Sequence, residues 1–215
     1  MEDKTFKKSE IESIISILEE MYPDAGCSLY YKNPLDLLIA TILAAQCTDI
    51  KVNKVTKNLF LKYKDIKDYQ KVDIEELEED IRPTGFFKNK AKNIKACVEK
   101  ILKDFNGKVP DSLDELVKLK GVGRKTANVI LSNAYKIPAI PVDTHVKRLS
   151  NRIGLSKNKD PEKIEYDLMN LIPKEKWSKF SHLLIFHGRE ICKAKKPKCE
   201  ICKINPWCQF YTSFR

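Results

Sequence analysis

The sequence has little glycine and no long apolar run, and these two shortages exclude several classes of protein. Only 7 of the 215 residues are glycine, while 42% are hydrophobic and 33% are charged. This balance excludes collagen-like and low-complexity chains and argues against extensive disorder. The longest apolar stretch, residues 37–45, is interrupted by Thr41, whereas a membrane span needs about 20 apolar residues. We therefore expect a compact protein with a real core that does not cross a membrane.

The amino terminus lacks the features of a secretory signal. Glu2 and Asp3 precede any apolar run, whereas a signal places a basic segment before a hydrophobic one. We therefore expect the protein to stay in the cytoplasm.

Positive charge is in excess. The formal net charge is +10 and the pI is about 9.1. Such a field attracts polyanions, of which nucleic acid is the commonest partner. A lysine-rich solvated surface, from a biased genome or a thermophile, explains the charge equally well. The charge alone does not decide between them.

Apolar residues recur at helical spacing along the chain, without the alternation that is typical of strands. Asn33 and Pro34 form a helix start, as N-cap and first helical residue, and Asn106-Gly107 forms a helix end. The sequence therefore predicts an all-α fold. Further helix starts are predicted at Ser9 with Glu12, Thr48, Asp73 with Glu76, and Ser112 with Glu115.

Four cysteines are crowded near the end of the chain in a C-x6-C-x2-C-x5-C pattern: Cys192, Cys199, Cys202 and Cys208. Zinc sites usually pair two C-x-x-C knuckles, whereas one close pair flanked by single cysteines suits a 4Fe-4S cluster, with zinc as the alternative. Disulfides conflict with the missing signal and with three further cysteines. We interpret those three, Cys27, Cys47 and Cys97, as plain buried residues.

A second motif joins two helices through Gly121-Val122-Gly123 and continues into Arg124 and Lys125. Two glycines permit a tight turn that presents N-H groups to a phosphate. Lys125 lies nearly opposite the apolar stripe of its helix, so we expect it to face a cleft rather than the core. An amine in positive surroundings is more readily neutral and can act as a nucleophile. A solvated surface lysine is the alternative.

Asp143 follows Pro141-Val142 and precedes Thr144. Its ordinary role is the N-cap of the next helix. A carboxylate at a reacting sugar would also stabilise positive charge or assist proton transfer.

Together these motifs resemble the endonuclease III family of DNA glycosylases. The resemblance runs from about residue 9 to residue 210. It rests on the hairpin with residues 124–129 (RKTANV), on residues 141–146 (PVDTHV) and on the four-cysteine tail. Residues 43–49 (LAAQCTD), 84–91 (TGFFKNKA) and 187–189 (HGR) add to it.

The resemblance implies a two-domain helix-hairpin-helix glycosylase fold. Residues 27–137 would form a six-helix barrel, residues 1–26 and 138–215 a cluster domain, and DNA would bind in the cleft between them. The implied activity is removal of oxidised pyrimidines from double-stranded DNA and β-elimination at the abasic site. Lys125 would be the Schiff-base nucleophile and Asp143 the catalytic carboxylate. The four cysteines would hold one 4Fe-4S cluster, and the enzyme would be a monomer.

The resemblance also implies DNA contacts. Gln46 and Phe86 match the wedge positions that fill the gap left by an extruded base. The family wedge is often aliphatic, and Phe86 or Phe87 as a core residue is the alternative. The remaining predicted contacts are Lys120, Gly121, Val122, Gly123, Arg124, His145, Lys193, Lys195, Lys196 and Lys198.

Two other functions compete with this one. An adenine or thymine mismatch glycosylase would share the fold, but such relatives often lack the nucleophilic lysine that Lys125 supplies. A non-catalytic DNA-binding module would use the hairpin and the cluster without chemistry.

Overall fold

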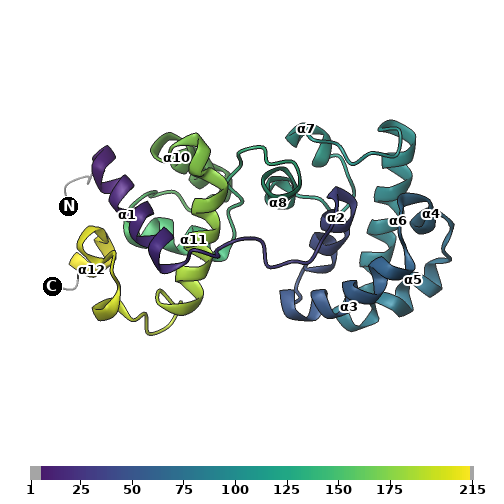
Figure 1. Ribbon diagram of the computed structural model, residues 1–215, viewed down its shortest axis with the longest axis horizontal. Helices are drawn as coiled ribbons and strands as arrows, with labels where there is room; N and C mark the ends of the chain where they lie inside the picture. Colours follow the sequence, from purple (N-terminus) through teal and green to yellow (C-terminus); the bar gives the residue numbers. More distant parts are fainter. Residues whose placement is uncertain (1–5, 214–215) are drawn as a thin grey trace. The chain divides into compact units, whose positions relative to one another are not determined.

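The computed structural model describes residues 6–213, and these contain helices and no strand (Figure 1). The all-α prediction is confirmed. The chain divides into two compact units. The first, here called the hairpin unit, is Cys27–Ile137, and the second, the cysteine unit, joins the residues up to Gly26 to those from Pro138 onward. Residues 1–5 and 214–215, which the predicted cluster domain includes, lie outside the described residues.

The hairpin unit is built around one buried helix. Helix α2 packs against α3, α6 and α8, and Leu37, Leu38, Ile39 and Leu43 along it are fully buried. A helix that is apolar on all sides belongs in the middle of a bundle. The elements of this unit are α2 (Pro34–Leu43), α3 (Asp49–Lys62), α4 (Ile66–Lys71), α5 (Ile74–Ile81), the 3-10 turn η1 (Arg82–Thr84), α6 (Phe87–Asp104), α7 (Leu113–Leu116) and α8 (Arg124–Ala134).

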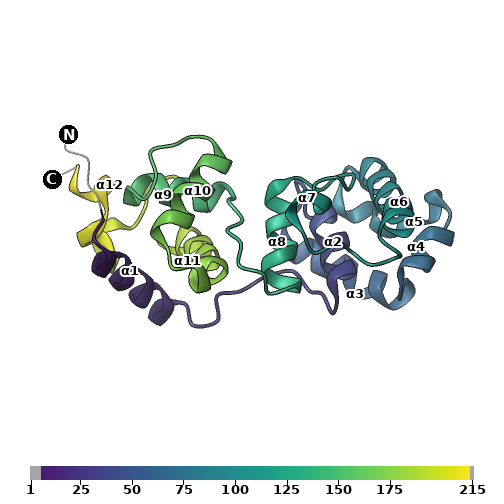
Figure 2. The same ribbon diagram turned by 90° about the horizontal axis from the view of Figure 1, so that it is seen from above.

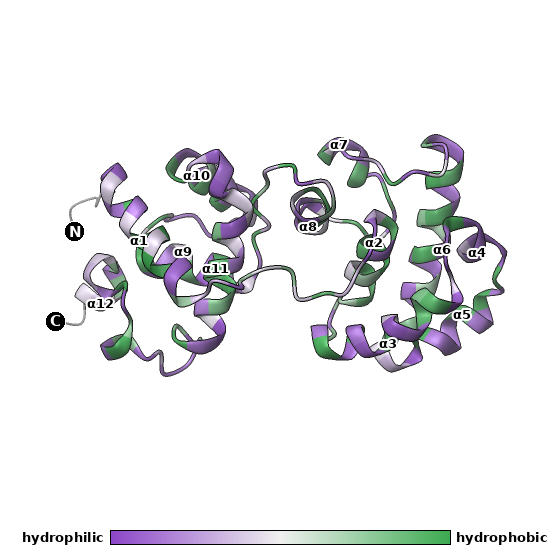
Figure 3. Cartoon of the chain, viewed as in Figure 1, coloured by the Kyte–Doolittle hydropathy of each residue, from purple (hydrophilic) through white to green (hydrophobic). Residues whose placement is uncertain are grey.

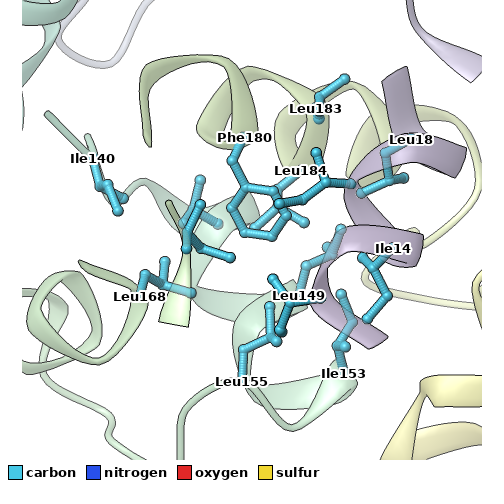
Figure 4. Packing of buried hydrophobic residues seen from close by; sticks show 14 of the residues in the cluster. Ile14, Leu18, Ile140, Leu149, Ile153, Leu155, Leu168, Phe180, Leu183 and Leu184 are labelled. Carbon is cyan, nitrogen blue, oxygen red and sulfur yellow. The ribbon is translucent and has the colours of Figure 1, made fainter. Parts of the chain in front are cut away.

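The cysteine unit is organised by α11, which packs against α1 and α9 (Figure 2). Phe180 of α11 lies in a cluster of buried hydrophobic residues that includes Leu149 and Leu184 (Figure 4). Each such buried side chain contributes about 1.5–3 kcal/mol. The elements of this unit are α1 (Lys8–Met21), α9 (Thr144–Ile153), α10 (Pro161–Leu171), η2 (Lys174–Lys176), α11 (Trp177–Glu190), η3 (Cys199–Ile201), η4 (Asn205–Trp207) and α12 (Gln209–Thr212).

Several predicted helix ends are confirmed. The Asn33 side chain accepts a hydrogen bond from the Asp36 N-H at 2.9 Å, with Pro34 as the first helical residue. Helix α6 ends where Asn106 and Gly107 take positive φ values of 50° and 77°. Hydrophobic and hydrophilic faces lie side by side along the helices (Figure 3), as expected for helices packed on a core.

The predicted capping box of Ser9 with Glu12 is wrong. Helix α1 begins at Lys8, because the carboxylate of Glu10 accepts a hydrogen bond from the Lys7 N-H at 2.8 Å and closes the helix end before Ser9. Helix α4 was not predicted at all. It is six residues long, too short for a hydrophobic period, and Asp65 caps it.

No described helix is long and apolar enough to cross a membrane.

Candidate functional site

The glycine hairpin lies between α7 and α8 and is anchored by two buried side chains, Leu119 and Val122. Gly121 has a φ of +80°, and a Cβ there would lie 3.1 Å from the Asn93 side chain. The turn therefore requires glycine at this position. Gly123 is different: its φ of −90° is open to any residue, and a Cβ would meet nothing within 4 Å. Gly123 is the N-cap of α8, where glycine is among the favoured residues, and the open space at its Cα leaves its backbone accessible to an outside partner.

Lys125 is the second residue of α8 and is exposed, while Ala127, Ile130 and Leu131 are buried on the helix. The expectation that Lys125 points away from the core is confirmed. The first N-H groups of a helix have no partner within the helix and carry partial positive charge. Arg124 and Lys125 add cations where acidic residues are normally favoured. The arrangement weakens the helix end and suits an anion next to the amine.

Asp143 belongs to the cysteine unit, where it is half-buried at the start of α9. Its Oδ1 accepts a hydrogen bond from the Val146 N-H at 2.8 Å, so the predicted N-cap is confirmed. His145 lies two residues after Asp143, and its Nδ1 is 3.2 Å from Nη2 of Arg148. Burial lowers the pKa of His145, although the nearby Asp143 carboxylate raises it. His145 therefore stays neutral at pH 7 and packs within its own unit.

The two predicted wedge residues lie in exposed loops of the hairpin unit. Gln46 follows α2 and Phe86 precedes α6, and both have left-handed backbone conformations with φ of 52° and 49°. The Phe86 side chain is 64% exposed, so the alternative of a core residue is wrong for Phe86. Phe87 is half-buried beneath the guanidinium of Arg82, which lies 5.2 Å from the ring centroid.

The four carboxy-terminal cysteines line one pocket of the cysteine unit, with an empty volume of about 370 Å³. Among residues 6–213, no group of three or more Cys, His, Asp or Glu is close enough to hold a single metal ion. A 4Fe-4S cluster takes one thiolate on each of its four irons, and the four cysteines that line this pocket supply that number of thiolates.

The surroundings of the cysteines are apolar. Burial raises the pKa of Cys199 and Cys208, and raises that of Cys202 to about 11. Without a metal these groups stay protonated, whereas bound iron stabilises the thiolates. Of the other cysteines, Cys97 is fully buried. Cys27 and Cys47 are only half-buried, so the prediction of plain buried residues is wrong for these two.

Two arginines of α9 bind backbone carbonyls at the end of α11 and in the loop between Cys192 and Cys199, here called the cysteine loop. The sequence did not suggest this role. Arg148 donates to the Cys192 carbonyl at 2.9 Å and to the Gly188 carbonyl at 3.0 Å. Arg152 donates to the carbonyls of Lys193 and Ala194 at 2.7 and 2.9 Å. The loop lysines themselves are exposed: Lys193, Lys195, Lys196 and Lys198.

His187 connects the cysteines to α1. Its Nε2 lies 3.3 Å from Sγ of Cys202, and its Nδ1 lies 3.1 Å from the Tyr22 hydroxyl. Burial lowers the His187 pKa to about 4, so the ring is neutral at pH 7. A metal-bound thiolate only accepts hydrogen bonds, so the proton would lie on Nε2 with Tyr22 donating to Nδ1.

Comparison with known proteins identifies the family. Residues 39–174 match the model of the HhH-GPD superfamily of base excision DNA repair proteins, and residues 192–208 match the iron-sulfur binding domain of endonuclease III. An endonuclease III from Synechocystis sp. is 52% identical, over 94% of this chain and 93% of its own length. The chain belongs to the endonuclease III family. Another member, from Bacillus subtilis, is 49% identical over 93% of this chain and 92% of its own length.

A solved endonuclease III structure has the same fold. It is a trapped endonuclease III-DNA covalent intermediate, 47% identical in sequence, with a TM-score of 0.91 over 98% of this chain and 99% of that one. Family membership gives the chain its activity, that of a DNA glycosylase with abasic-site lyase activity. It also gives the cofactor, one 4Fe-4S cluster. When bound, the cluster links the segments of the chain that carry its cysteine ligands.

Replacing one cysteine tests which residues hold the cluster. We expect Cys202→Ala to lower the iron content from about four atoms per chain to near zero, because a cubane needs a thiolate on each iron. The matched control is Cys97→Ala, which removes a buried thiol that is remote in sequence from the quartet. Iron analysis and visible absorbance measure the outcome. Full iron content in Cys202→Ala would exclude Cys202 as a ligand.

Proposed function

We propose that the chain removes oxidised pyrimidines from double-stranded DNA and cuts 3′ to the abasic site, with Lys125 as nucleophile and Asp143 as catalytic carboxylate. The observation that carries the proposal is the position of Lys125. It is an exposed amine in the first turn of α8, two residues after the unobstructed backbone of Gly123. The covalent DNA intermediate of the related endonuclease III supports it.

The proposed chemistry needs one amine for both steps. The lone pair of neutral Lys125 Nζ attacks C1′ of the damaged nucleotide, and the base leaves with the electrons of the glycosidic bond. Loss of a proton from nitrogen and opening of the sugar give an imine between Nζ and C1′. The imine acidifies C2′, whose proton is lost as the 3′ phosphate departs. Water then hydrolyses the imine and releases the lysine.

We assign two functions to Asp143. Its Oδ1 caps α9, which fixes the position of the carboxylate. Its negative charge would stabilise the positive charge that develops on the sugar as the base leaves, and it would accept a proton from the attacking amine. His145, held neutral by burial, is the weakest of the predicted DNA contacts because it packs against Arg148.

The remaining charges suit DNA. The hairpin backbone and Lys120, Arg124 and the exposed loop lysines would bind phosphates, and Gln46 and Phe86 would fill the gap left by the extruded nucleotide. Each bound phosphate releases counterions, so we expect affinity to fall steeply with salt. We further propose that the enzyme works as a monomer on nucleoid DNA.

Borohydride trapping tests the function. The cluster-loaded protein is incubated with duplex DNA containing thymine glycol, and sodium borohydride is added to reduce any imine to a stable amine. We expect a covalent protein-DNA adduct and a peptide map that places it on Lys125. Undamaged duplex of the same sequence is the control. A cluster-loaded protein that binds the damaged duplex but forms no adduct would instead be a non-catalytic binding module.

A further inference from the structure

Lys90 is a buried amine that the proposed mechanism does not use. Only 4% of the residue is exposed, and a buried cation is rare and unfavourable unless it is fully compensated. Its Nζ donates to two backbone carbonyls, Leu43 at 2.8 Å and Thr84 at 2.9 Å. Burial lowers the pKa of Lys90, because a buried surrounding disfavours the charged ammonium. The burial of this lysine therefore calls for an explanation.

The two carbonyls belong to the two loops that carry the predicted wedge residues. Leu43 is the last residue of α2, three positions before Gln46, and Thr84 ends η1, two positions before Phe86. The Lys90 ammonium therefore joins the start of the Gln46 loop to Thr84, two positions before Phe86.

Both wedge residues have a strained backbone. Gln46 and Phe86 lie in the left-handed region, which is unfavourable for a non-glycine residue and persists only where the surroundings enforce it. Both are exposed, and Phe86 presents a large aromatic ring to solvent. Neither arrangement benefits the isolated fold. An ammonium that fixes both loops supplies the enforcement.

We infer that Lys90 is a positioning residue for base extrusion: its buried ammonium ties the Gln46 loop to the Phe86 loop and holds both side chains in place for insertion into DNA. This inference rests on the proposed function, in which these two side chains fill the gap. Lys90 itself touches neither the damaged base nor the sugar.

The simpler reading is that Lys90 only stabilises the fold, and α6 offers a control lysine that is half-exposed but also binds backbone carbonyls. Lys95, one turn and a half further along α6, makes the same kind of contact: its Nζ donates to the carbonyls of Tyr69, Gln70 and Val72 at 3.1, 2.7 and 2.8 Å. It fixes the end of α4, which carries no predicted DNA contact. A purely structural lysine should behave like Lys95.

The experiment compares two single-turnover rates on the same preparation. One is base release from duplex DNA containing thymine glycol, which requires extrusion, and the other is cleavage of single-stranded DNA at a preformed abasic site, which does not. Their ratio is independent of the fraction of folded protein. We expect Lys90→Met to lower the ratio about tenfold to a hundredfold, and Lys95→Met to leave it unchanged. Lys90→Arg, which keeps the charge and the donors, should recover most of it.

A double-mutant cycle makes the test specific. In a Gln46→Ala/Phe86→Ala background, Lys90→Met should cause no further fall in the ratio, because there is nothing left to position. If Lys90→Met does not fold, Lys90→Gln, which keeps one donor on a shorter side chain, is measured in the same way. An unchanged ratio in the folded variant, or a fall equal to that of Lys95→Met, overturns the inference. Failure of the wild type to be trapped by borohydride overturns the proposed function instead.

Discussion

Lys125→Ala is expected to lower the single-turnover rate of strand cleavage at an abasic site by about a thousandfold or more, because no imine forms without the amine. Binding of duplex DNA that carries a tetrahydrofuran abasic analogue should largely survive. Lys125 is exposed, so its replacement leaves no cavity. Removing a cation from the positive end of α8 should even raise stability slightly. Quenched-flow cleavage assays, fluorescence anisotropy and thermal unfolding measure the three outcomes.

The control for Lys125 is Lys120→Ala. Lys120 is also exposed and directly precedes the hairpin, so its loss removes one charge without removing the proposed nucleophile. We expect unchanged cleavage at saturating DNA and a salt dependence of binding that is shallower by about 0.9 in the log-log slope. If Lys125→Ala cleaves DNA at the wild-type rate and an adduct is still trapped on another residue, Lys125 is not the nucleophile.

Local features of the fold could be predicted from the sequence where a single short motif decides them. Asn33-Pro34 starts α2 and Asn106-Gly107 ends α6 as expected, since caps and left-handed ends depend on one or two residues. The start of α1 was predicted two residues late, because two competing carboxylates, Glu10 and Glu12, lie at capping distance from different residues and pattern alone does not rank them.

Candidate site residues could be predicted from the sequence where the type of side chain itself indicates the chemistry. An amine after a glycine hairpin and four cysteines in series can be recognised in a sequence. Lys90 and Arg148 could not be found in this way, because each binds backbone carbonyls that are remote in sequence, 47 positions from Lys90 and 44 from Arg148. Every type of residue has a backbone carbonyl, so no sequence pattern identifies the residue that accepts the hydrogen bond. Only the tertiary structure shows which carbonyls these cations bind.

Gly123 shows a different limit. The sequence suggested that both glycines make the turn, yet only Gly121 has a positive φ. The structure separates the two requirements: Gly121 is needed for the backbone and for the space occupied by Asn93, whereas Gly123 meets no neighbour. Gly123 serves as the N-cap of α8, and its missing side chain also leaves room for a partner to approach the backbone.

Asp143→Asn is expected to slow base release by about 10²–10⁴-fold while leaving the fold intact. Asparagine caps a helix as well as aspartate does, so the hydrogen bond from the Val146 N-H to this side chain is kept. The substitution removes only the negative charge and the basic oxygen. Single-turnover release of thymine glycol measures the chemistry, and thermal unfolding verifies that stability is unchanged.

Asp143→Ala removes both functions and so separates them. It should lose as much activity as Asp143→Asn and, in addition, about 1 kcal/mol of stability through the missing cap. The matched control is Asp160→Ala: Asp160 caps α10 in the same unit and accepts from the N-H groups of Glu162 and Lys163, each at 3.0 Å. That variant should lose the same stability and no activity. Equal rates in wild type and Asp143→Asn would mean that Asp143 is a helix cap and that the carboxylate of the reaction is another residue.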